Sequence, residues 1–253
     1  VIGVAKTMVS EIFGSNAVLI EMATTSTLVL LFFANYVVML SAFNMVGRFI
    51  WASTSDYIGR KNTYHCFFVL GAILYSSIPY FALQASADPT TVLYFAGFCI
   101  ASMIIFTMYG GGFATIPAYL ADIFGTMHVG GIHGRLLTAW STAGVLGPLS
   151  ITELRSYSLN QAINDLVQKI DPSKFLDKFG APVEQLDQLV AAKTVSIARL
   201  MEIVPEGTID PTPSLYNTTM YAMAGLLVVA FLANLLMKPV HSKHHYQGDP
   251  TKA

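Results

Sequence analysis

Residues 47–61 read GRFIWASTSDYIGRK, and this stretch decides the fold because of the sequence on either side of it. Residues 22–47 lead into it and residues 62–87 follow it, and both runs lack Asp, Glu, Lys and Arg. Each run is long enough to cross a bilayer, which takes about 20 apolar residues in a helix. A charged turn between two such runs is typical of a short loop at a membrane surface.

Within this turn, the residue types indicate specific roles. Gly59 allows a sharp turn, and Arg60 and Lys61 are suited to face lipid headgroups. Asp56 is expected to cap a helix that begins near residue 57 and to form an ion pair with Arg48 or Arg60. Such a pair could hold one conformation and release in another.

Composition excludes an ordinary soluble domain. Of the 253 residues, 54% are hydrophobic and only 11% are charged, whereas soluble domains carry about 25% charged residues. The formal net charge of −1 gives no reason to expect nucleic acid as a partner. Cys66 and Cys99 both lie in apolar runs, without the spacing of a disulfide framework or a metal site. We predict no cofactor and no metal.

Further charge-free runs at 89–121, 136–152 and 211–237 predict additional spans. The apolar stretch 1–9 is too short to span alone and is interrupted by Lys6, so we interpret it as the end of a first helix. Because the runs show no alternation of polar and apolar residues, strands are not expected. The sequence predicts an all-α membrane protein with helices in 1–152, an extracytoplasmic helical insertion at 153–210, a last span at 211–238 and a tail at 239–253.

Basic residues orient the predicted helices. They gather in three connections on one side of the membrane: Arg48, Arg60, Lys61, Arg135, Lys238, Lys243 and Lys252. The short connections on the other side contain acidic residues and no Lys or Arg, so the basic side is expected to be cytoplasmic. The predicted location is the plasma membrane or the bacterial inner membrane.

The segment 153–210 differs from the rest, with nine acidic and six basic residues. Asp171 and Pro172 predict a helix start, and Gly180 predicts its end. A second, amphipathic helix is predicted over 183–203 from the spacing of its apolar residues. The segment is either a cap that binds a partner or an insertion packed on the outer surface of the membrane domain.

The turn resembles the loop motif of the major facilitator superfamily, carried here by Asp56, Gly59, Arg60 and Lys61, with Ala52 where a glycine is usual. Residues 109–125 (YGGGFATIPAYLADIFG) and 132–148 (IHGRLLTAWSTAGVLGP) resemble the oxalate/formate antiporter family of that superfamily. The resemblance covers about three quarters of the chain. It implies twelve helices, carriage of small carboxylates with a coupled proton or counter-anion, and no organic cofactor. The chain would be the C-terminal six-helix bundle, its first helix truncated, with the N-terminal half as its missing partner.

The turn and these two blocks also suggest where helices bend or pack and which residues form a gate. Gly110, Gly111, Gly112 and Pro117 either allow the helix to bend or permit close helix packing, and both interpretations stay open. Gly144, Gly147 and Pro148 are similar to a Gly-Pro motif in the first half of superfamily antiporters. Gating is assigned to the residues of the two basic connections: Arg48, Asp56, Gly59, Arg60, Lys61, Asp122 and Arg135.

Substrate contacts are the least determined feature. The candidates are the one cation in an apolar stretch and four groups of the later helices: Lys6, Tyr109, Thr138, Trp140 and Ser141. Lys6 could equally be a lysine that reaches the membrane surface. Because 22–47 and 136–152 lack Lys and Arg, we expect a monocarboxylate such as formate or pyruvate rather than oxalate. An enzyme is not expected, and a non-transporting sensor that uses 153–210 is the alternative.

Overall fold

The structure is a computed structural model that describes residues 8–9, 11–13, 21, 35–88 and 92–241. Every regular element in these residues is helical, as the unbroken apolar runs predict. The long helices are α4 (Tyr36–Ile58), α5 (Arg60–Ala87), α6 (Leu93–Phe124), α7 (Val129–Val167) and α11 (Asn217–Leu236). The short ones are α8 (Pro172–Phe179), η1 (Val183–Gln185), α9 (Leu186–Ala191), α10 (Ile197–Met201) and η2 (Thr212–Ser214).

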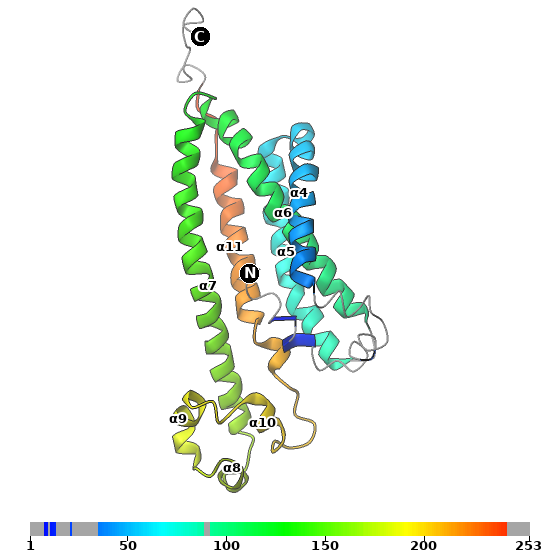
Figure 1. The fold of residues 1–253 in the computed structure, drawn as a ribbon, viewed down its shortest axis with the longest axis vertical. Coiled ribbons are helices and arrows are strands. Elements are labelled where there is room, and N and C mark those ends of the chain that lie inside the picture. The colour runs from blue at the N-terminus through cyan, green and yellow to red at the C-terminus, as the bar shows by residue number, and fades with distance from the viewer. Residues whose placement is uncertain (1–7, 10, 14–20, 22–34, 89–91, 242–253) are drawn as a thin grey trace, which may run out of the picture.

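The long helices form a bundle with α7 on one flank (Figure 1). Helix α4 packs chiefly on α6, and α5 packs on both α6 and α11. Helix α7 meets α6 and α11 more sparsely, and most of its residues from 134 to 150 are exposed. The helices α8, α9 and α10 gather at the far end of α7 (Figure 1).

Among the residues that the structure describes, four helices are long and apolar enough to cross a membrane: Tyr36–Ile58, Arg60–Ala87, Leu93–Phe124 and Thr212–Leu236. The predicted span at 136–152 is not among them. It forms part of α7, which continues to Val167 and whose first turns carry glycines, His133 and Arg135. A helix of 39 residues is roughly 58 Å long, far more than the bilayer core of about 30 Å.

The basic connections meet at one end of the bundle, as their spacing predicts. Gly59 separates α4 from α5 with a φ of 85°, the left-handed region that glycine adopts without strain. The expectation that Asp56 caps a new helix is wrong, because α4 continues to Ile58 and Asp56 lies in its last turn. The last residues of α6 and the chain after α11 also meet here, since Val240 N donates to the Ile123 carbonyl at 2.9 Å.

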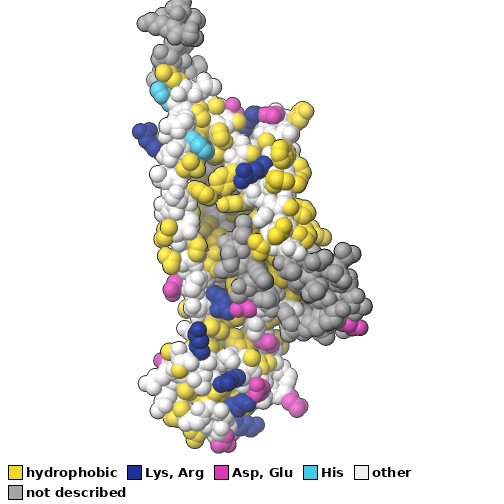
Figure 2. Space-filling model, viewed as in Figure 1, with side chains coloured by type: hydrophobic (Ala, Val, Ile, Leu, Met, Phe, Trp, Pro, Cys, Tyr) yellow, Lys and Arg dark blue, Asp and Glu magenta, His cyan; other side chains and the backbone are white. Residues whose placement is uncertain are grey.

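The segment 153–210 begins as an extension of α7 and then folds back in short helices. The predicted helix start and end are confirmed: the Asp171 side chain accepts from Ser173 N, and Gly180 ends α8 with a φ of 71°. The single helix predicted over 183–203 is wrong, because that stretch divides into η1, α9 and α10. Figure 2 shows charged side chains concentrated on this part, below a largely uncharged bundle.

Candidate functional site

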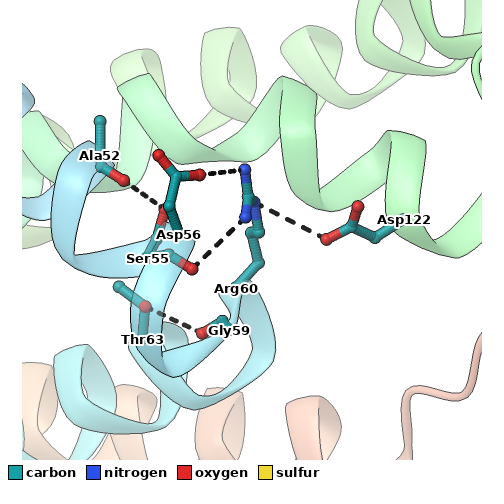
Figure 3. Close-up of polar contacts among 7 residues, drawn as sticks. All are labelled: Ala52, Ser55, Asp56, Gly59, Arg60, Thr63 and Asp122. Carbon is teal, nitrogen blue, oxygen red and sulfur yellow. Dashed lines mark hydrogen bonds and ion pairs between the residues drawn. The ribbon is translucent and has the colours of Figure 1, made fainter.

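The charged turn is built around Arg60 (Figure 3). Its Nη2 lies 2.5 Å from Asp56 Oδ1, and its Nε lies 3.7 Å from Asp122 Oδ2. Its Nη1 also donates to the Ser55 carbonyl at 3.4 Å. One guanidinium therefore joins the end of α4 to the end of α6, and Arg60 rather than Arg48 is the partner of Asp56.

Lys61 ties the same turn to the end of α11. Its Nζ donates to the carbonyls of Leu235 at 3.1 Å and Met237 at 2.8 Å. The last carbonyls of a helix have no partner within the helix and carry its negative dipole end, so a lysine is favourable there. Asn234 Nδ2 donates back to the Lys61 carbonyl at 3.2 Å, and Tyr119 OH donates to Asn234 Oδ1 at 2.8 Å.

The other two predicted gating cations lie outside this cluster. Arg48 and Arg135 are both exposed. Neither forms an ion pair with any residue that the structure describes. The structure therefore brings together Asp56, Gly59, Arg60, Lys61 and Asp122 and leaves Arg48 and Arg135 apart from them.

The three consecutive glycines of α6 have different surroundings. A Cβ at Gly110 would lie 1.9 Å from the Asn44 carbonyl oxygen, and one at Gly111 would lie 2.5 Å from Trp51 Cβ. From the α4 side, a Cβ at Gly47 would lie 2.1 Å from the Thr107 carbonyl oxygen. These glycines let the backbones of α4 and α6 touch, which is close helix packing. Gly112 has nothing within 4 Å of its Cβ position.

Tyr109 and Trp140, two of the predicted substrate contacts, lie together across α6 and α7. Trp140 Nε1 donates to Tyr109 OH at 3.4 Å, and the Phe113 ring packs edge-on against both. These two residues line a cavity of about 340 Å³ between α5, α6, α7 and α11. They also line a neighbouring space of about 810 Å³, which is bordered by Gly144, Gly147 and Pro148.

The remaining substrate candidates have other positions. Thr138 and Ser141 bond to carbonyls of their own helix, those of Arg135 at 2.7 Å and Leu137 at 3.1 Å. Neither lines the two cavities above. Lys6 lies outside the described residues. Within the described part of the chain, no group of three or more His, Cys, Asp or Glu residues could hold a metal ion.

One polar cluster had no signal in the sequence. Arg155 on α7 donates from Nη2 to Glu11 Oε1 at 2.5 Å and from Nε to Tyr216 OH at 3.1 Å. Tyr216 OH in turn donates to Glu11 Oε2 at 2.7 Å. Because Glu11 and Tyr216 are 205 positions apart in the sequence, no local spacing could have indicated their contact.

Comparison with known proteins gives one match to a protein of known activity. The chain is 32% identical over 105 residues to an oxalate:formate antiporter of Oxalobacter formigenes. The match covers 42% of this chain and 23% of that relative, so this chain spans well under two thirds of the protein it matches. No family model matches the chain. No solved structure matches it either. The similarity is thus confined to part of each protein, and it falls in a chain whose described helices include ones long and apolar enough to cross a membrane.

Proposed function

We propose that this chain is the C-terminal six-helix half of a major facilitator superfamily transporter that moves a small monocarboxylate by alternating access. The observation that carries the proposal is the ion-paired turn between two membrane-capable helices, α4 and α5, in a chain similar to an oxalate:formate antiporter. An N-terminal half would complete the carrier, and a proton or counter-anion would be coupled to transport. The charged turn would face the cytoplasm.

In this proposal the turn acts as the cytoplasmic gate. Asp56 and Asp122 lie at the surface, with side chains 62% and 59% exposed, whereas the Arg60 side chain between them is 24% exposed. Exposed ion pairs are weak, typically worth about 0.2–1 kcal/mol. A contact of that strength can break and reform as the carrier changes conformation, whereas a deeply buried pair could not do so cheaply.

The substrate would approach the surface shared by α6 and α7. Tyr109 and Trp140 face each other there, and Gly144, Gly147 and Pro148 border the larger space beside them. A flexible or kinked α7 is compatible with Pro148, which lies inside the helix and breaks its hydrogen-bond ladder. No Lys or Arg is among the described residues that line either space, and a dicarboxylate needs such cations.

Uptake into proteoliposomes tests this proposal. The full-length protein would be reconstituted with internal unlabelled anion, and entry of radiolabelled formate, pyruvate and oxalate would be followed. We expect saturable monocarboxylate exchange, at least tenfold slower in Asp56→Asn. Glu184→Gln, which changes a carboxylate in the 153–210 segment, serves as the matched control and should exchange normally.

A sensor built on the same helices is the second candidate. The 153–210 segment has its own buried side chains, with Phe175 and Leu200 fully buried, so it is a folded unit that could receive a ligand. Absence of flux across the whole carboxylate panel, in protein that is correctly inserted and still binds one of the anions, would favour this reading over a carrier.

A further inference from the structure

The smaller cavity is lined almost wholly by hydrocarbon. Seven of its lining residues are aromatic, contributed by three helices: Tyr64, Phe67, Phe68, Tyr75, Tyr109, Phe113 and Trp140. Its volume of about 340 Å³ lies at the lower end of the range for small-molecule sites. The open position at Gly112 is one of its walls. A cavity of this kind accommodates an apolar body of modest size.

Among the described residues that line this cavity, His133 has the one side chain that can become cationic. Its Nδ1 is buried and has no hydrogen-bond partner in the part of the chain that the structure describes. A buried polar atom without a partner is costly, so a rotation of the His133 ring that brought this nitrogen to a ligand in the cavity would be favourable. The Tyr109 hydroxyl accepts from Trp140, which leaves its own proton to donate.

We propose that this cavity binds a monocarboxylate with an apolar body, and that His133 receives the carboxylate. The inference rests on the proposed function and narrows its substrate class. A carboxylate in an apolar site needs a donor to replace water, and a ring N–H of His133 can supply one, in the neutral imidazole or in imidazolium. One such donor matches one carboxylate, and the aromatic rings cover the rest of the molecule.

The same reasoning disfavours oxalate and formate as ligands of this cavity. Oxalate carries two charges and has no apolar part, so its second carboxylate would lie among aromatic rings without a cation. Formate has no body to displace water from those rings. Binding energy in this cavity therefore comes mainly from the apolar part of the ligand, at roughly 25 cal/mol for each Å² of apolar surface removed from water.

Equilibrium binding of radiolabelled phenylacetate to the purified full-length protein in nanodiscs tests the assignment. We expect saturable binding at one site, with unlabelled phenylacetate competing and both phenylacetamide and oxalate competing at least tenfold less well. His133→Gln should weaken binding at least tenfold. His65→Gln is the matched control, because His65 also has a buried, unpartnered ring nitrogen but does not line the cavity.

A second variant tests the cavity apart from the histidine. Gly112→Leu adds a side chain where nothing lies within 4 Å, so it should fill the space and abolish binding with little change in melting temperature. Unchanged phenylacetate affinity in both His133→Gln and Gly112→Leu, or equal competition by oxalate, overturns the assignment. Carboxylate exchange that survives both variants would leave the carrier proposal standing without this site. Binding without any flux would keep the site and remove the carrier.

Discussion

At the scale of single residues, the glycine triplet of α6 shows how neighbouring identical residues acquire different roles. Gly110 and Gly111 lie against α4, where backbone and Trp51 occupy the space that a side chain would need. Gly112 points into the aromatic cavity, and its carbonyl accepts from Tyr64 OH at 2.7 Å. Close packing is thus observed at Gly110 and Gly111, and bending of this helix stays a prediction.

This difference predicts opposite effects on stability for alanine substitutions at Gly110 and Gly112. Gly110→Ala places a Cβ 1.9 Å from a backbone oxygen, so α4 and α6 must separate, at a cost of about 1–3 kcal/mol. Gly112→Ala meets no atom and gains helix propensity worth up to about 1 kcal/mol. Thermal unfolding of the two variants in the same detergent measures the difference. Equal melting temperatures would contradict the packing described for α4 and α6.

Arg60 offers a second residue-scale prediction. Its planar guanidinium meets Asp56, Asp122 and the Ser55 carbonyl together, whereas a lysine presents a single point charge. Arg60→Lys is therefore expected to slow anion exchange about tenfold while lowering the free energy of unfolding by less than about 1 kcal/mol. Arg48→Lys, at an exposed arginine outside the cluster, is the control. Normal exchange by Arg60→Lys would remove the gating role.

At the scale of elements, the short helices are joined by an ion pair that should respond to acid. Lys178 Nζ of α8 lies 2.5 Å from Glu202 Oε2, the residue after α10. The hydrogen bond and charge of Lys178 lower the pKa of Glu202 below its usual 4.5. A depressed carboxylate pKa stabilises the folded state above the unfolded pKa, and that contribution is lost as the pH falls through the folded value.

The protection factors for hydrogen exchange in α8 and α10, which are corrected for the intrinsic pH dependence of amide exchange, should therefore be constant above about pH 5 and fall as the pH drops below 4.5. Glu202→Gln should remove this dependence and show the lower protection at every pH. Asp187→Asn, which changes another carboxylate of the same segment, should retain the acid response. An unchanged profile in Glu202→Gln would mean that the pair does not hold the two helices together.

Local signals account for what the sequence predicts correctly. The spans come from apolar runs, the turn from Gly59, and α8 from Asp171 and Gly180 at its ends. Local signals do not predict that the stretch 183–203 divides into several short helices. The helical run is interrupted at Lys193, which adopts a φ of 56° that its residue type does not favour. Burial of the residues beyond it, Val195, Ile197 and Leu200, shows that tertiary packing outweighs the helical periodicity there.

At the scale of the molecule, α11 is held at both ends. Lys61 binds the carbonyls at its C-terminal end, and Tyr216, just before its first residue, joins Arg155 and Glu11. A helix of 20 residues separates these contacts by about 30 Å. Both clusters join helices of this chain to one another, so they favour a bundle that moves as one rigid body. Alternating access relies on such rigid-body movement of one helical bundle against another.

The Glu11–Arg155–Tyr216 cluster should behave as a single unit in stability measurements. Arg155→Gln and Glu11→Gln are each expected to lower the free energy of unfolding by about 1–2 kcal/mol, because each leaves a partly buried polar partner unpaired. The double variant should cost little more than either single one, since residues in one network are not additive. Arg199→Gln, which changes an exposed arginine outside this cluster that bonds to a local carbonyl, is the control. Strict additivity would show that the contacts are independent.

Helices α7 and α11 both have exposed apolar side chains, but we expect these side chains to face different surroundings. Val145 on α7 and Val229 on α11 are both 63% exposed. At helical spacing Val145 shares its face with Thr138 and Ser141, and α7 is not among the four membrane-capable helices. Val229 shares its face with Leu226 and Leu236 on a helix that is among the four. We expect the first face to line a hydrated pathway and the second to contact lipid.

Single cysteines at these two positions separate the cases in the full-length protein. The exposed Cys66 would first be replaced by Ser, while the buried Cys99 is retained. A charged, membrane-impermeant thiol reagent should then modify Val145→Cys rapidly and leave Val229→Cys intact. A bound monocarboxylate should slow the reaction at position 145, because alternating access closes the pathway around its substrate. Equal reaction at both positions, or at neither, would show that α7 does not face the pathway and would place the substrate route on another surface of the bundle.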